Sequence, residues 1–392
     1  MSLIGRKITV LGGGVAGLTV AVALARRGAA VTVLEQAEAI REVGAGLQIS
    51  PNGAAVLRGL GLAEELERIG QRSAGVSLRN GSDGARVLRL DLTRLRPDQP
   101  YYFVHRADLI EILAEAARSA GVQVRLLQKI ERVSLGDHPP HLSTAQGALL
   151  EVPLLIGADG LHSVVRAALN GKIAPFFTHQ VAWRATIPAG PNIRPEAEVF
   201  MGPGRHLVTY PLRGGALRNI VAVEERHRWA EEGWNLHDDP IALRFAFKGF
   251  SREVRSWLDQ VEDPYLWGLF RHPVAPRWHG NGAVILGDAA HPTLPFLAQG
   301  ANMALEDGWV LAESLAGHDS AEAGFAAFQL AREARVKRAV EAANRNAKAY
   351  HLSGVPRAVA HLGLRLGARF APSVPLSRFD WLYGHDVTAA GV

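Results

Sequence analysis

The glycine-rich segment at 12–17 constrains the fold of this chain more than any other feature. It follows a short apolar run at 7–11 and leads into an alanine- and leucine-rich stretch at about 15–26. The glycines have the spacing GxGxxG. The first permits a tight turn, the second lets a pyrophosphate approach the backbone, and the third lets a helix pack on a strand. The sequence therefore predicts a strand, turn and helix that bind a dinucleotide. The contacting residues are expected to be Gly12, Gly14, Val15, Ala16 and Gly17.

A second apolar run at 30–34 ends at Glu35, about 20 residues further on. A carboxylate at that place binds a ribose hydroxyl and disfavours a 2′-phosphate. We include the next residue, Gln36, in the same cofactor site. The motif by itself does not distinguish FAD from NAD.

The segment 284–307 has another strand–turn–helix pattern. An apolar run at 284–286 precedes the Gly-Asp turn with Asp288, a proline-stiffened loop, and a helix that opens at Gln299 and Gly300. A carboxylate directly after a strand accepts hydrogen bonds from a sugar hydroxyl. A helix that starts with Gly leaves its free N–H groups open to a flat or anionic group. Two distant motifs then serve one long cofactor, which favours FAD.

Two shorter segments complete the pattern. Residues 154–166 again have an apolar run, an Asp-Gly turn and a helix, in which Ser163 and Arg166 share one face if the helix starts near Gly160. Arg106 opens an amphipathic helix. The inward side chains of that helix are expected to be Leu109, Ile112, Leu113 and Ala116.

In this order, these segments resemble the motifs of the single-component, FAD-dependent aromatic hydroxylases of the p-hydroxybenzoate and salicylate hydroxylase type (group A flavoprotein monooxygenases). The segment at 379–384 is similar to the salicylate hydroxylase branch. The resembling parts of the chain are 7–60, 101–170, 200–215, 280–315 and this C-terminal segment. The resemblance implies an NADH- or NADPH-consuming enzyme that uses O₂, through a flavin hydroperoxide, to hydroxylate a small aromatic or heteroaromatic substrate. Salicylate-, hydroxybenzoate- and hydroxynicotinate-like substrates stay open.

The resemblance also implies roles for individual residues. Those near the FAD pyrophosphate and ribose are Arg106, Asp159, Gly160 and Arg166. Those in the flavin-flanking loop 41–47 are Arg41 and Gly46. Those at the flavin are Asp288 at the ribityl chain, Pro295 beside the ring, and Gly300, Ala301 and Asn302 at its pyrimidine edge. The alternatives are structural: Arg106 paired with helix acids, the loop as a connection, and Pro295 as a loop stiffener.

Between these motifs the pattern changes to strands, which we expect at 181–188, 197–201, 206–212 and 217–224, with a hairpin turn at 213–215. His206, Val208 and Tyr210 share one face by period-two alternation. A His with a pKa of about 6.5 can remove the proton of a phenolic substrate. Related hydroxybenzoate hydroxylases resemble this chain in having a His four residues before a Tyr. His206 and Tyr210 are therefore predicted to be catalytic, and His291 is the competing base.

Gln299 is the third predicted catalytic residue, because its amide could hydrogen-bond the substrate or the peroxide; a capping or backbone contact is the alternative. A small acid as substrate would need a cation in the pocket, such as Arg184 or Arg205. The histidines lack the close spacing of metal ligands, so we predict no metal site.

The predicted fold class is α/β: a Rossmann-like FAD-binding domain, similar to p-hydroxybenzoate hydroxylase, interleaved with a mixed β-sheet substrate domain and C-terminal helices. Residues 71–100 are expected to add strands to the substrate sheet. The predicted FAD-binding domain comprises 1–70, 101–175 and 276–352, and the predicted substrate domain comprises 71–100 and 176–275. The remaining segment, 353–392, is expected to close the substrate domain or to form a contact in a homodimer.

Composition narrows the class of protein. The chain has 392 residues, no cysteine and a net charge of +5. It contains no apolar run long enough to span a bilayer and no signal-peptide pattern, so we expect a cytoplasmic protein. The basic residues of 332–348 alternate with acids on a helical pattern. They indicate a solvated helix face, and we predict no nucleic-acid partner.

Two other functions are compatible with the motifs. The first is the same flavin chemistry on a larger polycyclic, quinolone, urate-like or antibiotic substrate. The second is a non-catalytic flavin-binding protein. Oxidation of NADH that depends on O₂ and is stimulated by an aromatic substrate would distinguish an enzyme from a binding protein.

Overall fold

A six-stranded sheet carries the predicted dinucleotide motif. The computed structural model describes all residues except 1, 41–44, 192, 227–235, 371–372 and 390–392, so Arg41 lies outside the described residues. The strand order is β19-β20-β12-β1-β2-β8, parallel except for β19. The strands are β1 (Lys7–Leu11), β2 (Ala30–Leu34), β8 (Gln123–Arg125), β12 (Leu155–Gly157), β19 (His279–Gly280) and β20 (Ala283–Ile285).

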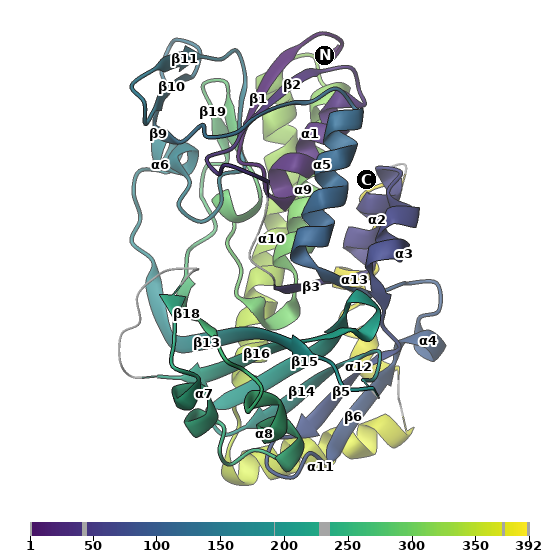
Figure 1. The fold of residues 1–392 in the computed structure, drawn as a ribbon. Helices are drawn as coiled ribbons and strands as arrows, with labels where there is room; N and C mark the ends of the chain where they lie inside the picture. The colour runs from purple at the N-terminus through teal and green to yellow at the C-terminus, as the bar shows by residue number, and fades with distance from the viewer. Residues whose placement is uncertain (1, 41–44, 192, 227–235, 371–372, 390–392) are drawn as a thin grey trace.

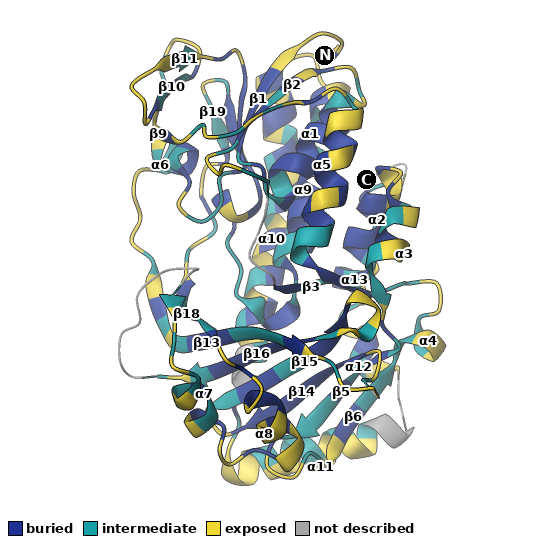
Figure 2. Cartoon of the chain, viewed as in Figure 1, coloured by how far each residue is buried: buried dark blue, intermediate teal, exposed yellow. Residues whose placement is uncertain are grey.

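Helices pack in layers beside this sheet. Helix α1 (Val15–Ala25) follows β1 as predicted and packs between α5 (Arg106–Ser119) and α9 (Gly300–Gly317). Because α1 consists almost entirely of Ala, Val, Leu and Thr, it is buried on nearly every side. Figure 2 shows α1 and α9 as the most buried helices of this part. The predicted inward residues of α5, Leu109, Ile112, Leu113 and Ala116, are all buried.

An eight-stranded sheet forms the other half of the molecule (Figure 1). The order is β17-β18-β13-β16-β15-β14-β5-β6. The strands are β5 (Gly75–Asn80), β6 (Arg86–Asp91), β13 (Phe176–Pro188), β14 (Glu196–Gly202), β15 (Arg205–Leu212), β16 (Leu217–Glu225), β17 (Leu236–His237) and β18 (Tyr265–Arg271). All four predicted strands are present, and β5 and β6 join the same sheet, as expected for 71–100. The division into two domains at the predicted boundaries stays a prediction.

The two faces of this sheet have different partners. Side chains such as Trp183 and Leu207 pack on α7 (Pro240–Ala246) and α8 (Arg252–Leu258). The alternate residues, including Val208 and Val221, face the six-stranded half and pack with Phe296. The period-two alternation of the strands therefore puts one row of side chains between the two halves.

Helix α10 (Ala321–Tyr350) runs from the six-stranded half to the eight-stranded sheet (Figure 1). After it come α11 (Gly354–Phe370), which packs on β6, and the short helices α12 (Val374–Ser377) and α13 (Asp380–Tyr383). The remaining elements are α2 (Pro51–Gly59), α3 (Ala63–Ile69), α4 (Leu92–Leu95), α6 (Val164–Asn170), the sheet β3 (Gly46–Ile49), β4 (Gln71–Arg72) and β7 (Tyr102–His105), the sheet β9 (Ile130–Ser134), β10 (His141–Thr144) and β11 (Leu149–Glu151), and three 3₁₀ turns, η1 (Arg213–Gly215), η2 (Gly287–Ala289) and η3 (Pro295–Leu297).

Two expectations from the sequence need correction. Helix α6 begins at Val164, not near Gly160, because Ser163 caps it by accepting a hydrogen bond from the Arg166 N–H. The basic stretch of α10 is not entirely a solvated face, since Arg332 and Arg335 form buried ion pairs with α9.

None of the described helices combines the length and apolar character that crossing a bilayer requires.

Candidate active site

One cavity of about 1090 Å³ connects the glycine-rich turn, the start of α9 and the inner face of the eight-stranded sheet. Most of the predicted site residues line it. They are Gly12, Gly14, Val15, Ala16, Glu35, Gln36, Gly46, Arg106, Asp159, Gly160, His206, Tyr210, Asp288, Pro295, Gln299, Gly300 and Ala301. Three described residues of the prediction, Gly17, Arg166 and Asn302, are not part of its lining.

The turn after β1 is packed as the sequence predicts. Gly12 has φ +105°, and a Cβ at this position would lie 2.4 Å from the Ala158 carbonyl oxygen. A Cβ on Gly17 would lie 1.9 Å from the Gly12 carbonyl oxygen, so Gly17 acts through packing of α1 on the turn. The Glu35 carboxylate accepts hydrogen bonds from Gly13 N (2.6 Å) and Ala37 N (2.8 Å), which fixes it beside the turn.

Asp159 lines the cavity beside the glycine turn, and a Cβ on Gly12 would lie 3.2 Å from its Cα. Its carboxylate accepts hydrogen bonds from Ser163 Oγ (2.5 Å) and Val164 N (2.8 Å) at the start of α6. Burial raises the pKa of Asp159, and these hydrogen bonds partly offset the shift. Arg166 points elsewhere, because its guanidinium donates to the backbone carbonyls of Pro273, Ala289 and Ala290. The structure therefore does not bring Arg166 to the cofactor site but uses it to brace η2.

Arg106, at the start of α5, and Asp288, in η2, both line the cavity. Burial lowers the pKa of the Arg106 guanidinium, and the charge of Asp288 opposes that shift. The Asp288 side chain is open to the cavity itself. An enclosed cation for phosphate and a carboxylate for sugar hydroxyls are the groups that a dinucleotide linker needs.

The N-terminus of α9 forms another part of the cavity wall. Gly300 and Ala301 line the cavity, where the first N–H groups of the helix and its dipole favour negative charge. The Asn302 amide is hydrogen-bonded within the protein, and the expected contact of this residue with the flavin stays a prediction. The amide accepts from Ser50 N (3.0 Å) and donates to Gln48 O (2.9 Å) and Ala298 O (2.7 Å), so it joins α9 to β3 and the start of α2.

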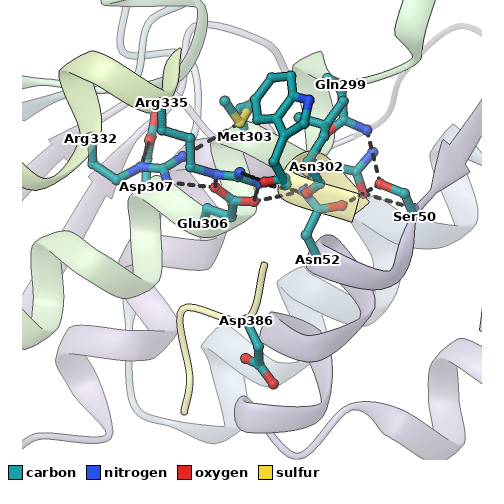
Figure 3. Close-up of polar contacts among 12 residues, drawn as sticks. Ser50, Asn52, Gln299, Asn302, Met303, Glu306, Asp307, Arg332, Arg335 and Asp386 are labelled. Carbon is teal, nitrogen blue, oxygen red and sulfur yellow. Dashed lines mark hydrogen bonds and ion pairs between the residues drawn. The ribbon is translucent and has the colours of Figure 1, made fainter. Parts of the chain in front are cut away.

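Gln299 belongs to a buried polar network behind this helix terminus (Figure 3). Its amide nitrogen donates to Ser50 Oγ (3.0 Å), and its amide oxygen accepts from Asn52 Nδ2 (3.1 Å). A hydrogen bond from this amide to a substrate would have to replace one of these contacts. Gln299 is the N-cap residue of α9, but its side chain makes no capping hydrogen bond. The catalytic role of Gln299 stays a prediction.

Four charged residues continue the network below α9 (Figure 3). Glu306 pairs with Arg335 (2.7 Å) and Arg332 (2.5 Å), and Asp307 pairs with Arg332 (2.8 Å). Both carboxylates are fully buried, and the neighbouring cations hold their pKa values below the ordinary range despite burial. The network anchors α9, whose N-terminus lines the cavity, onto α10.

His291, the competing base, belongs to this network. Its Nε2 lies 2.5 Å from Asp307 Oδ2, the ring is 1% exposed, and the residue does not line the cavity. This placement favours the structural role that the sequence left open for His291.

The inner face of the eight-stranded sheet forms the other wall. Arg184 on β13 lines the cavity with its guanidinium over the Trp267 indole. Arg205 points to the opposite face, where it pairs with Glu224 (3.4 Å), so only Arg184 of the two candidate cations reaches the cavity. Tyr210 stacks on Phe103 with 5.0 Å between ring centroids. Burial raises the pKa of Tyr210 to about 12, which keeps the phenol protonated.

His206 lies further along β15 on the same face as Tyr210. Its ring is 2% exposed and lies 5.8 Å from the Phe296 ring, between the sheet and η3. Burial and the nearby His351 lower the pKa of His206 well below its ordinary value. The expectation of an ordinary histidine pKa is therefore wrong, because the sequence does not show how completely the strand is covered.

Several site residues were not found from the sequence. Trp267 and Gln48 line the cavity, and Gln48 Oε1 accepts a hydrogen bond from the Tyr101 hydroxyl (2.9 Å). His351, after α10, lies 2.7 Å from His206. None of these has a local motif, since each is brought to the site by contacts between distant segments.

The donor set fits FAD. The glycine turn excludes side chains where a pyrophosphate would pass, Glu35 and Asp288 offer carboxylates for sugar hydroxyls, and the α9 terminus faces the end where a ring would lie. All of these groups line one cavity, as a single long cofactor requires.

Comparison with known proteins agrees with this geometry. The family model of the FAD binding domain matches residues 6–345. A 3-amino-4-hydroxybenzoate 2-monooxygenase of Streptomyces cremeus is 36% identical over 96% of this chain and 95% of its own. A 3-hydroxybenzoate 6-hydroxylase of Polaromonas naphthalenivorans is 33% identical over 97% and 96%. Among solved structures, a salicylate hydroxylase substrate complex aligns with a TM-score of 0.80, at 21% identity over 98% of this chain and 96% of that chain.

The family match covers most of the chain, and the relatives align over nearly its whole length. The predicted cofactor FAD and the predicted class of enzyme are therefore confirmed. The chain belongs to the FAD-dependent aromatic hydroxylases, flavoprotein monooxygenases that act on small aromatic substrates.

Proposed function

We propose that the substrate is a phenolic aromatic acid whose carboxylate binds Arg184 and whose hydroxyl faces His206. Arg184 carries this proposal. It is a cation inside the cavity, and no carboxylate of the described residues pairs with it. Burying a charge without a partner is costly, so an anionic ligand is the expected partner. The names of the relatives, which specify hydroxybenzoates and aminohydroxybenzoates, support the same substrate class.

The strand register supports the placement of both groups. Arg184 pairs with Val221, and Val221 pairs with Val208, so these residues form one rank across three strands. His206 lies two residues beyond Val208 on the same face. With about 4.8 Å between strands and about 7 Å for two residues, the Cα atoms of Arg184 and His206 are about 12 Å apart. Two converging side chains and one substituted benzene ring can bridge this distance.

The chain's own residues then prepare the substrate. Arg184 holds the carboxylate and fixes the orientation of the ring. His206 accepts the phenol proton at Nε2, which makes the ring electron-rich and reactive towards an electrophilic oxygen. The apolar wall of Val208, Val221 and Phe296 excludes water. Bound FAD would supply the electrons that activate O₂, and O₂ would supply the oxygen atom that is transferred to the ring.

The proposal includes NADH or NADPH and O₂ as co-substrates. The family supports both, and the sequence has one GxGxxG only, so the nicotinamide would not bind to a second Rossmann motif. A cytoplasmic location and a homodimer stay predictions.

A larger apolar substrate is the second candidate. The cavity continues between β6 and α11, where Leu88, Leu90 and Leu364 line it. This extension agrees with the expectation that the C-terminal segment closes the substrate side.

A panel experiment tests the proposal. The holoenzyme is mixed with NADH or NADPH, and nicotinamide oxidation, O₂ uptake and products are measured with hydroxybenzoates, 3-amino-4-hydroxybenzoate, 6-hydroxynicotinate and a bicyclic quinolone. We expect at least one of the phenolic acids to stimulate O₂-dependent oxidation and to yield a hydroxylated product. The matched control is the carboxamide of the same acid, which should be inactive. Equal turnover of acid and carboxamide would exclude recognition by Arg184, and turnover of the quinolone alone would favour the second candidate.

A further inference from the structure

Three side chains form a continuous hydrogen-bonded path from the cavity to the surface. His206 Nδ1 lies 2.7 Å from His351 Nε2, and His351 Nδ1 lies 2.7 Å from Glu225 Oε1. His206 lines the cavity, the His351 side chain is 3% exposed, and the Glu225 side chain is 53% exposed. The path thus begins at the predicted base and ends at a carboxylate in water.

Three separate segments build this path. His206 is near the start of β15, Glu225 is the last residue of β16, and His351 follows the C-terminus of α10. The backbone also holds them together: Gly204 N donates to His351 O (3.3 Å), and Glu225 N donates to Gly204 O (2.9 Å). The alignment of the two rings is therefore supported by the turn between β14 and β15.

We propose that His206, His351 and Glu225 form a proton relay that carries the phenol proton of the substrate from the cavity to solvent. The proposal rests on the proposed role of His206 as the base. It adds His351 and Glu225, which do not touch the substrate, as positioning and relay residues.

The hydrogen bonds determine the tautomers. An ionised carboxylate only accepts, so His351 Nδ1 must carry the proton that Glu225 accepts. In neutral His351, Nε2 is then an acceptor, and His206 Nδ1 must donate to it. Neutral His206 consequently has an unprotonated Nε2, the remaining ring nitrogen. The surface carboxylate thereby keeps the second nitrogen of His206 ready to accept a proton.

The surroundings make a relay necessary. Phe296 and Tyr350 cover the His206 ring, and its pKa is held well below the ordinary value by burial and by His351. The positively charged form of His206 is therefore disfavoured, so this residue is not expected to retain a proton taken from a phenol. The charged groups around the outer end are Arg205, Glu224, Glu225 and Arg226. Burial and Arg205 lower the pKa of His351, whereas Glu225 opposes that shift.

The transfer is balanced and reversible. The phenol O–H bond breaks as His206 Nε2 gains the proton, while the Nδ1 proton of His206 moves to His351 Nε2. The Nδ1 proton of His351 moves to Glu225, which releases it to water. The substrate becomes a phenolate, both rings stay neutral in the other tautomer, and the reverse sequence returns a proton to the product.

The experiment follows phenolate formation without turnover. Oxidised holoenzyme is mixed rapidly with 4-hydroxy-3-nitrobenzoate, a hydroxybenzoate whose ionised form is yellow, at a pH below the probe's own pKa. Wild type is compared with His206→Ala, His351→Ala and Glu225→Gln. Glu224→Gln is the matched control, because the neighbouring carboxylate pairs with Arg205 and Arg226 and lies outside the path. FAD content and thermal unfolding are measured for every variant.

We expect His351→Ala to slow the appearance of the yellow phenolate by about tenfold or more, with an unchanged final amplitude. Added imidazole should restore the rate in proportion to its concentration, which a merely structural role would not produce. Glu225→Gln keeps an acceptor for His351 but cannot take the proton, so it should also be slow. Glu224→Gln should match wild type.

The remaining outcomes separate the two proposals. Wild-type rates in both His351→Ala and Glu225→Gln, with a slow His206→Ala, would overturn the relay and leave His206 as the base. A fast His206→Ala, or no phenolate with wild type, would overturn both. If His351→Ala loses FAD, the surface variant Glu225→Gln decides, and a wild-type rate in that variant contradicts the relay.

Discussion

The guanidinium of Arg184 lies over the indole of Trp267, with 4.0 Å between Cζ and the ring centroid. The stacking holds the cation through the face of the guanidinium and leaves its N–H edge for a ligand. Burial lowers the pKa of Arg184 to about 10, so the group is still charged at neutral pH. At this part of the cavity wall, Trp267 therefore provides a flat aromatic surface and Arg184 provides a positive charge.

Replacing Arg184 by Met should weaken binding of phenolic acids. Loss of charge-assisted hydrogen bonds of about 1.5–3 kcal/mol raises the dissociation constant by about 10- to 150-fold. Titration of FAD fluorescence or absorbance with 3-hydroxybenzoate measures this. Arg205→Met is the control, because Arg205 bonds on the outer face of the sheet, and it should bind the acid normally. Equal losses in the two variants would contradict the assignment.

His206→Ala should retain FAD yet lower the rate of hydroxylation by about 100-fold at neutral pH. The rate should recover as the pH rises towards the substrate's own phenol pKa, because the phenolate then forms in solution. A pH profile of product formation checks this sign. A variant rate that stays low at every pH would indicate that His206 does more than remove a proton.

Gly46→Ala should disturb the substrate side rather than the cofactor. A Cβ there would lie 2.6 Å from Tyr210 Cε2 and 2.8 Å from Asn219 Cγ. Tyr210 would have to move, and a displacement of about 1 Å can lower kcat/KM by about 100-fold. The control is Gly190→Ala, because a Cβ at that position meets no atom within 4 Å. Loss of FAD from the Gly46 variant would instead support the flavin-flanking role predicted from the sequence.

Asp307→Asn should destabilise the folded protein by about 3 kcal/mol, because it leaves His291 and Arg332 without this buried anion. Urea unfolding measures the loss. Exposed Glu313, which pairs with Arg27, is the control, and Glu313→Gln should change the stability by less than about 1 kcal/mol.

The same carboxylates set the response of stability to acid. The pKa values of Glu306 and Asp307 are lowered in the folded state. Their contribution is therefore complete above the unfolded values of about 4 and is lost as the pH falls through the folded ones. Unfolding free energies measured from neutral pH to pH of about 3 should fall for wild type more steeply than for Asp307→Asn. Parallel curves would contradict the linkage.

The cofactor side could be predicted from the sequence because its signals are local. Gly12 and Gly17 need no distant partner to specify a turn and a helix, and Glu35 follows directly from its strand. The alternation of His206 and Tyr210 likewise depends on one strand alone. These predictions concern neighbours in the chain, where spacing determines direction.

The remainder depended on contacts between distant segments. The charges of Arg332 and Arg335 indicated a solvated face, but the acids they meet, Glu306 and Asp307, are on another helix. His351 and Arg166 both show that a motif does not determine whether a residue reaches the site. His351 has no motif and reaches His206 across 145 residues, whereas Arg166 has a motif and turns towards backbone carbonyls.

Helix α10 connects the two halves of the molecule. At about 1.5 Å per residue its 30 residues span about 45 Å. Near its middle it is bonded to α9 by buried ion pairs, and directly after its C-terminus His351 contacts β15 and β16. The helix therefore holds the six-stranded half and the eight-stranded sheet at a fixed distance. A hinge between the halves would separate His351 from His206 and Glu225, so the motions of turnover are expected within the cavity, in its loops and in the position of the ring.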